Sequence, residues 1–216
     1  MKTILISVPR CGTTNLYNYV STVTNDYICY NEPFKEERIH INEFYRYNTI
    51  VNNKNIFVKQ IYSHKPQEFL NKTFEEIYNL VYNDFDNIVF LDRHDKTKQT
   101  ESFVHAHCTD IWHGFYNFNI KNIKSKLISN NNLDENAELD SLELTKNILV
   151  NISTNLTNTA DKFSKKIYYY EDIYFNKEKM IEFLNELKIE FNNDWYNHFL
   201  SEKNKYRNDL ITDKLI

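Results

Sequence analysis

TILISVPRCGTTNLYNYVSTVT, residues 3–24, is the stretch that decides the fold of this chain. A run at 4–8 in which all residues but Ser7 are apolar, and most are β-branched, leads to Pro9 and a short polar turn at 10–14. From residue 16 to residue 23, apolar and aromatic residues recur every three or four positions. A short apolar run bounded by turn residues is typical of a buried strand, and the later spacing is typical of a helix. The stretch therefore predicts a buried strand, a tight loop and a helix.

The loop has the chemistry of an anion-binding site. N–H groups at the start of a helix attract negative charge, while Thr13 and Thr14 add hydroxyl donors and Arg10 adds a fixed positive charge. Gly12 is one of only two glycines in 216 residues. A chain so poor in glycine indicates a backbone need here, either a positive φ angle or close approach of a ligand. We interpret the loop as a phosphate cradle, and a plain strand–helix turn is the alternative.

Composition bounds the class of protein. A length of 216 residues suits one domain, and hydrophobic and aromatic contents of 41% and 15% can fill a core. The net charge of −4 gives no basic field for nucleic acid or an anionic membrane. No apolar run approaches the roughly 20 residues of a membrane span, and no signal peptide is visible, so we expect a cytoplasmic protein. The three cysteines lack a disulfide framework and should be reduced.

The rest of the chain alternates between two hydrophobic patterns. Apolar runs predict further strands at 26–30, 55–62, 87–91 and 166–170. Helical spacing predicts a helix at 66–82, one that follows residues 92–95 and ends at about 108, and one at 138–163. Two more helices are predicted within 176–208. This alternation is typical of an α/β fold with one parallel sheet flanked by helices.

Charged and aromatic residues follow the predicted strands. Arg10, Glu32, His64, Arg93 and Tyr170 each stand where a strand ends. Because ligands of parallel sheets bind beyond the carboxyl ends of the strands, these residues should gather at one edge. The sequence therefore predicts one binding site assembled from five separate segments.

Two segments resemble signatures of sulfotransferases that use 3′-phosphoadenosine-5′-phosphosulfate (PAPS). Residues 9–14, PRCGTT, resemble the family's loop Pro-Arg/Lys-Ser-Gly-Thr-Thr. Residues 93–102, RHDKTKQTES, resemble its segment Arg-x-Asp-Lys-x-x-Gln-Ala-x-Ser, in the form of the bacterial trehalose and nodulation-factor sulfotransferases. The resemblance implies a sulfotransferase-type, P-loop-like fold in which Arg93 and Ser102 hold the 3′-phosphate. The other residues that would hold the nucleotide are those of the loop, Arg10, Cys11, Gly12, Thr13 and Thr14. An alternative for Arg93 is a surface ion pair with Asp92 or Asp95.

Two shorter matches extend the resemblance over roughly residues 3–175. Residues 31–34, NEPF, resemble the segment that supplies the general base in tyrosylprotein and bacterial sulfotransferases. Residues 169–173, YYEDI, resemble the Tyr-Glu-Asp-Leu segment whose tyrosine lies near the adenine, which implies that role for Tyr170. Trp112 resembles an acceptor-side aromatic residue of the bacterial branch, and Phe34 and His113 are the further acceptor-binding candidates.

The resemblance implies transfer of a sulfuryl group from PAPS to a hydroxyl or amine, with 3′-phosphoadenosine-5′-phosphate (PAP) as product and no metal ion. Arg10 and the loop would stabilise the leaving phosphate, and Lys59 is a candidate second cation. Glu32 is the first candidate for the general base, and His64 is its competitor. The expected partner is a small-molecule or glycan acceptor, with carbohydrate preferred.

We expect one sulfotransferase-like domain over residues 1–216. Its cofactor-binding core would comprise about 1–108 and 165–175, its acceptor region about 109–164, and its C-terminal helices 176–216.

Departures from the family pattern keep two other hypotheses open. Cys11 replaces the family's serine and Thr100 its alanine, so a degenerate module could bind PAP or another anion without turnover. A third hypothesis is an ATP-dependent, kinase-like transferase. The chain lacks the Gly-x4-Gly-Lys-Ser/Thr motif of such enzymes, and Asp92 is their one candidate magnesium ligand here.

Overall fold

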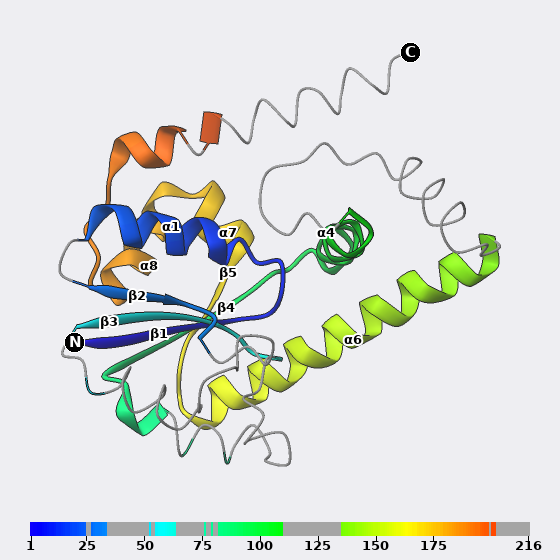
Figure 1. The fold of residues 1–216 in the computed structure, drawn as a ribbon, viewed down its shortest axis with the longest axis horizontal. Coiled ribbons are helices and arrows are strands. Elements are labelled where there is room, and N and C mark those ends of the chain that lie inside the picture. The colour runs from blue at the N-terminus through cyan, green and yellow to red at the C-terminus, as the bar shows by residue number, and fades with distance from the viewer. Residues whose placement is uncertain are drawn as a thin grey trace. The chain divides into compact units, whose positions relative to one another are not determined.

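The computed structural model describes residues 1–24, 27–33, 52, 55–63, 76, 79, 82–109, 135–198, 200 and 201 (Figure 1). The chain divides into two compact units. The first comprises residues 1–94 and 149–191, and the second comprises residues 95–148 and 192–216.

The described residues of the first unit form a five-stranded sheet in which every pair of neighbouring strands is parallel (Figure 1). The strand order is β2-β3-β1-β4-β5. The strands are β1 (Lys2–Ser7), β2 (Ile28–Asn31), β3 (Ile56–Ile61), β4 (Asn87–Asp92) and β5 (Ile167–Tyr169). The predicted α/β fold with one parallel sheet flanked by helices is confirmed.

Helices cover both faces of the sheet. Helices α1 (Thr13–Val23), α7 (Tyr170–Phe175) and α8 (Lys177–Glu186) lie on one face, and residues 149–162 of α6 (Glu135–Lys162) lie on the other (Figure 1). The hydroxyl of Tyr62 fastens α6 by donating to the Asn155 carbonyl at 3.1 Å and by bonding to the Thr159 hydroxyl at 2.9 Å. Every residue of β3 is buried, as expected for a parallel strand covered on both faces.

The predicted fifth strand, at 166–170, is too long at its end. Tyr170 begins helix α7 instead of ending β5. The run of three tyrosines has a strong strand propensity. However, Glu171 and Asp172 lie in the first turn of α7, where acidic side chains stabilise the helix N-terminus. The chain therefore turns one residue earlier than the pattern predicts.

The other predicted elements differ from the structure mainly at their ends. The second strand is Ile28–Asn31, later than the predicted 26–30, and α6 begins three residues before the predicted 138. Helix α4 (Lys96–Thr109) and a helix over residues 193–198 belong to the second unit. Most of the predicted helix at 66–82 lies outside the described residues, although Glu76 and Asn79 are helical and Tyr82–Asp84 forms the short helix η3. No helix among the described residues has both the length and the apolarity needed to cross a bilayer.

Candidate functional site

The first unit has a switch in chain direction where β1 and β4 lie side by side. The chain leaving β1 continues to β2 on one side of β1, and the chain leaving β4 continues to β5 on the other side. Ligands of open parallel sheets bind at such a point, beyond the carboxyl ends of the strands. Arg10 follows β1 and Arg93 follows β4, and Arg93 Nη1 donates to the Arg10 carbonyl at 3.4 Å. Two of the predicted site residues therefore meet at this switch.

The loop after β1 has an unusual backbone. Arg10 and Gly12 both have left-handed φ angles, of 65° and 72°. Glycine adopts this conformation without strain, whereas a non-glycine residue held there costs about 1–3 kcal/mol. Gly12 then precedes α1, whose N-terminus receives no hydrogen bond from a capping side chain. The predicted backbone need for a positive φ at Gly12 is confirmed.

Gly12 also lies against two tyrosine rings. A Cβ atom at this position would lie 2.7 Å from Tyr170 Cε2 and 3.0 Å from Tyr174 Cε2. The Tyr174 hydroxyl donates to the Gly12 carbonyl at 2.8 Å. The absence of a side chain at Gly12 thus lets α7 pack directly against the loop.

Replacing Gly12 with alanine should lower the free energy of unfolding by about 2–4 kcal/mol, because it adds backbone strain to a clash with Tyr170. Urea denaturation of the purified variant measures this. Asn18→Ala, an exposed position of the same helix, is the control and should change stability by less than about 0.5 kcal/mol. An unfolding midpoint for Gly12→Ala equal to that of the wild type would refute this account of the loop.

Lys59, Glu32 and Thr14 meet at the same edge of the sheet. The Lys59 ammonium lies 2.5 Å from Glu32 Oε1 and donates to the Thr14 hydroxyl at 3.2 Å. Asn31 pairs with Lys59 across β2 and β3, and the next residue, Glu32, donates its backbone N–H to the Lys59 carbonyl at 2.7 Å. Glu32 has a left-handed φ of 48°. The backbone bond and this strained conformation turn the carboxylate toward the ammonium.

Burial makes this cluster energetically important. The side chains of Lys59 and Glu32 are 2% and 13% exposed. A charge in such a position needs an opposite charge and hydrogen bonds, because it has lost most of its contact with water. The three residues come from three separate segments, so the fold places a carboxylate, a cation and a loop hydroxyl within hydrogen-bonding range.

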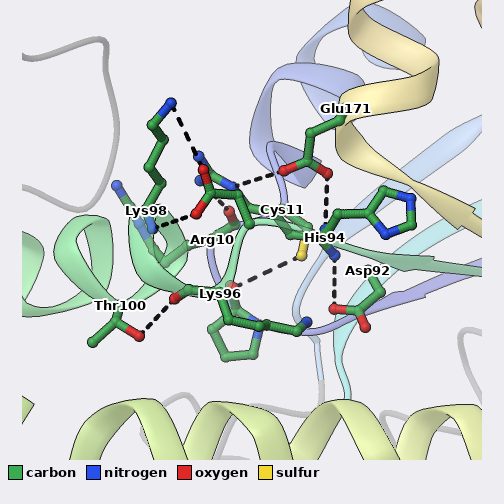
Figure 2. A network of polar contacts seen from close by, with 11 residues as sticks. Arg10, Cys11, Asp92, His94, Lys96, Lys98, Thr100 and Glu171 are labelled. Atoms are coloured by element: carbon green, nitrogen blue, oxygen red, sulfur yellow. Dashed lines mark hydrogen bonds and ion pairs between the residues drawn. The ribbon is translucent and has the colours of Figure 1, made fainter. Parts of the chain in front are cut away.

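The side chains of Cys11 and Thr13 face the interior of the unit. The Cys11 thiol is buried and donates to the Pro9 carbonyl at 3.8 Å (Figure 2). Thr13 is also buried, and its hydroxyl accepts from Ser7 Oγ at 3.4 Å. Of the two loop threonines, Thr14 is therefore the one whose hydroxyl contacts Lys59.

Arg93 is held between a ring and a carboxylate. Its guanidinium carbon lies 4.9 Å from the centre of the Tyr170 ring, and its Nε lies 3.4 Å from Glu171 Oε1. Glu171 Oε2 accepts from the His94 N–H at 2.9 Å (Figure 2). The ion-pair partner of Arg93 is thus Glu171. The sequence-based alternative had named Asp92 or Asp95 as that partner.

Tyr170 presents a neutral ring to this site. Burial raises the pKa of Tyr170 to about 12, against the smaller opposing effect of the Arg93 charge. The phenol is therefore protonated at neutral pH. Its ring contacts Arg93 on one side of the site and packs against Tyr174, with 4.7 Å between ring centres.

Asp92 has a structural environment. It is 2% exposed, its Oδ1 accepts from the Arg93 N–H at 2.7 Å, and its Oδ2 accepts from the Ser153 hydroxyl. These bonds join the end of β4 to α6 within the first unit. The candidate magnesium ligand of the kinase-like hypothesis is therefore engaged in holding the fold together.

The predicted segment 93–102 is divided between the two units. Arg93 belongs to the first unit, and Ser102 lies half-buried in α4 of the second. Within the second unit, Asp95 Oδ1 accepts from the Lys98 N–H at 2.9 Å at the start of α4. The aspartate of this segment is therefore a helix-capping residue. The predicted residues Phe34, His64, Trp112 and His113 lie outside the described residues.

The sequence indicated no role for two residues that shape the site. Glu171 stands within the segment YYEDI, but its contact with Arg93 depends on the packing of α7 against the end of β4. Tyr174 could have been found, because it lies four residues after Tyr170 and such pairs share a helix face.

The fold and the site define a class of protein. It is an α/β protein with three features at the carboxyl ends of its strands. These are a loop with left-handed backbone angles, a buried Lys59–Glu32 ion pair and an ion pair between Arg93 and Glu171. No family model matches the chain, and no curated protein matches it. The sulfotransferase resemblance therefore rests on the motifs.

Proposed function

We propose that this protein is a PAPS-dependent sulfotransferase that acts on a hydroxyl or amine acceptor, with carbohydrate preferred. The observation that carries the proposal is the cluster of Glu32, Lys59 and Thr14. A candidate base and a hydroxyl of the anion-binding loop lie 2.5 Å and 3.2 Å from the ammonium of a candidate cation. Each of these residues had a predicted role in the same reaction.

The residues present suit a ligand with two phosphate groups. The Nε of Arg93 is a buried donor that lacks a hydrogen-bond partner among the described residues, although Glu171 is its ion-pair partner. An anionic oxygen could accept from it. Arg93 would hold the 3′-phosphate, the role that the resemblance implies, and Arg10 with residues 12–14 would hold the 5′-phosphate. When bound, PAPS supplies the sulfuryl group and a phosphate leaving group.

Glu32 and Lys59 would have different roles in the transfer of the sulfuryl group. The acceptor oxygen forms a bond to sulfur while the bond from sulfur to the 5′-phosphate oxygen breaks, and Glu32 takes the acceptor proton. Lys59 stabilises the negative charge that develops on the leaving oxygen. The ion pair with Lys59 positions the Glu32 carboxylate beside the loop hydroxyl of Thr14.

A binding module without turnover is the second candidate. It is favoured by the pairing of two of the three candidate cations with carboxylates, Lys59 with Glu32 and Arg93 with Glu171. A cation whose charge is offset by a carboxylate stabilises the negative charge of a leaving phosphate less, so turnover loses more than binding. A kinase-like transferase is less favoured, because Asp92 is occupied by the Ser153 hydroxyl and the Arg93 N–H.

Transfer of label from ³⁵S-PAPS tests the proposal. The acceptors are a disaccharide, a chitin oligosaccharide and a simple phenol, and PAP formation is measured in parallel. We expect labelled product and PAP in equal amounts with at least one sugar. No labelled acceptor, in a protein that still binds PAP, would favour the binding module over the enzyme.

A further inference from the structure

Glu171 places a carboxylate beside two nitrogen donors of Arg93 and His94, the residues that directly follow β4. It lies in the first turn of α7, and one of its oxygens accepts from the backbone N–H of His94 (Figure 2). Its other oxygen contacts the guanidinium of Arg93. A backbone amide next to an arginine is the kind of donor pair that binds a phosphate oxygen. The carboxylate therefore competes for the donors that a phosphate group would use.

Glu171 and Arg93 form an ion pair without a hydrogen bond to Nε. The two atoms lie 3.4 Å apart, and Nε of Arg93 still has no hydrogen-bond partner among the described residues. The Arg93 guanidinium is oriented by other groups, since Nη1 donates to the Arg10 carbonyl and the Tyr170 ring lies beneath it. These two contacts still orient the guanidinium when the Glu171 carboxylate is removed.

We propose that Glu171 weakens phosphate binding at Arg93 and so limits the preference of the site for PAP over nucleotides without a 3′-phosphate. This inference rests on the proposed function. A phosphate that accepts from Nε would lie within several ångströms of the Glu171 carboxylate, which has the same sign of charge. At about 5 Å, in the intermediate dielectric of a protein edge, such repulsion is large enough to lower affinity about tenfold or more.

Calorimetric titration with PAP and with adenosine 5′-monophosphate (AMP) tests this role. AMP is PAP without its 3′-phosphate, so it reports every contact except the one at Arg93. Glu171→Gln keeps the shape of the side chain and an oxygen for the His94 N–H. We expect it to raise PAP affinity at least fivefold and to change AMP affinity less than twofold. Glu171→Ala should also raise PAP affinity, and it serves as the test if Glu171→Gln folds poorly.

The matched control is Asp172→Asn. Asp172 is the next residue, has a half-exposed carboxylate and lies 3.7 Å from the His94 ring instead of Arg93. This variant removes the same charge and should change both affinities less than twofold. Equal gains in PAP affinity for Asp172→Asn and Glu171→Gln would assign the effect to net charge and overturn the specific role of Glu171.

Two further outcomes separate this inference from the proposed function. If the wild type prefers PAP to AMP and Glu171→Gln leaves PAP affinity unchanged or lower, the inference about Glu171 is wrong while the function stands. If the wild type binds neither nucleotide, or binds PAP no more tightly than AMP, the phosphate site itself is wrong and the inference fails with it.

Discussion

Replacing Lys59 with methionine should lower the free energy of unfolding by about 3 kcal/mol. Methionine retains much of the length of lysine but has no charge, so the variant leaves Glu32 without the ammonium that lies 2.5 Å away. The carboxylate is 13% exposed and regains little contact with water. Its desolvation, more than the loss of packing, causes the expected destabilisation.

Urea denaturation of a double-mutant cycle measures this effect. Adding Glu32→Gln to Lys59→Met removes the remaining charge, and the double variant should recover at least about 1.5 kcal/mol relative to the sum of the single variants. Lys166→Met is the matched control, because the pair of Lys166 with Glu182 is about half-exposed. It should cost less than about 1 kcal/mol. Additive effects of Lys59→Met and Glu32→Gln would show that the two charges are not coupled.

Replacing Glu32 with glutamine should reduce turnover by about 10²–10⁴-fold, the usual contribution of a general base, without loss of PAP affinity. Turnover and affinity should separate because Glu32 contacts Lys59 and does not contact Arg93, the residue proposed to hold the 3′-phosphate. Sulfuryl transfer from PAPS measures turnover, and calorimetry with PAP measures affinity. Full turnover in this variant would remove Glu32 from the mechanism.

A pH profile separates a base from a residue that only positions Lys59. A base produces an acidic limb in the pH dependence of kcat/KM, where its protonated form cannot accept the acceptor proton. That limb should disappear in Glu32→Gln. His64→Asn tests the competing candidate, and its profile should keep the limb. Loss of the limb in His64→Asn instead would transfer the role of base to the histidine.

The fold could be predicted from the sequence because its signals are local. The apolar run before Pro9 and the helical spacing after Gly12 specify a buried strand and a helix with little ambiguity. The alternation of such segments then indicates a parallel sheet. The convergence of residues at the strand ends followed from this topology, and Arg10, Glu32, Lys59 and Arg93 lie at that edge of the first unit.

The partners of these residues could not be predicted, because they depend on packing between distant segments. Tyr170 was expected to end a strand, but it begins α7 and its ring lies against Gly12. Glu171 then comes beside Arg93, although 78 positions separate the two residues in the sequence. The inward position of the Cys11 thiol also has no local signal, since a serine at that position would fit the same motif.

Thermal stability of the purified protein with PAP, compared with ATP plus Mg²⁺ and with buffer, tests the central claim most directly, because it requires no known acceptor. PAP at about 100 times its Kd should stabilise the folded protein by roughly 2.7 kcal/mol and visibly raise the melting temperature. We predict that this rise is absent in Arg93→Ala and is retained in Lys166→Ala. No rise with PAP, or a rise only with ATP and Mg²⁺, would contradict the sulfotransferase assignment and favour the kinase-like alternative.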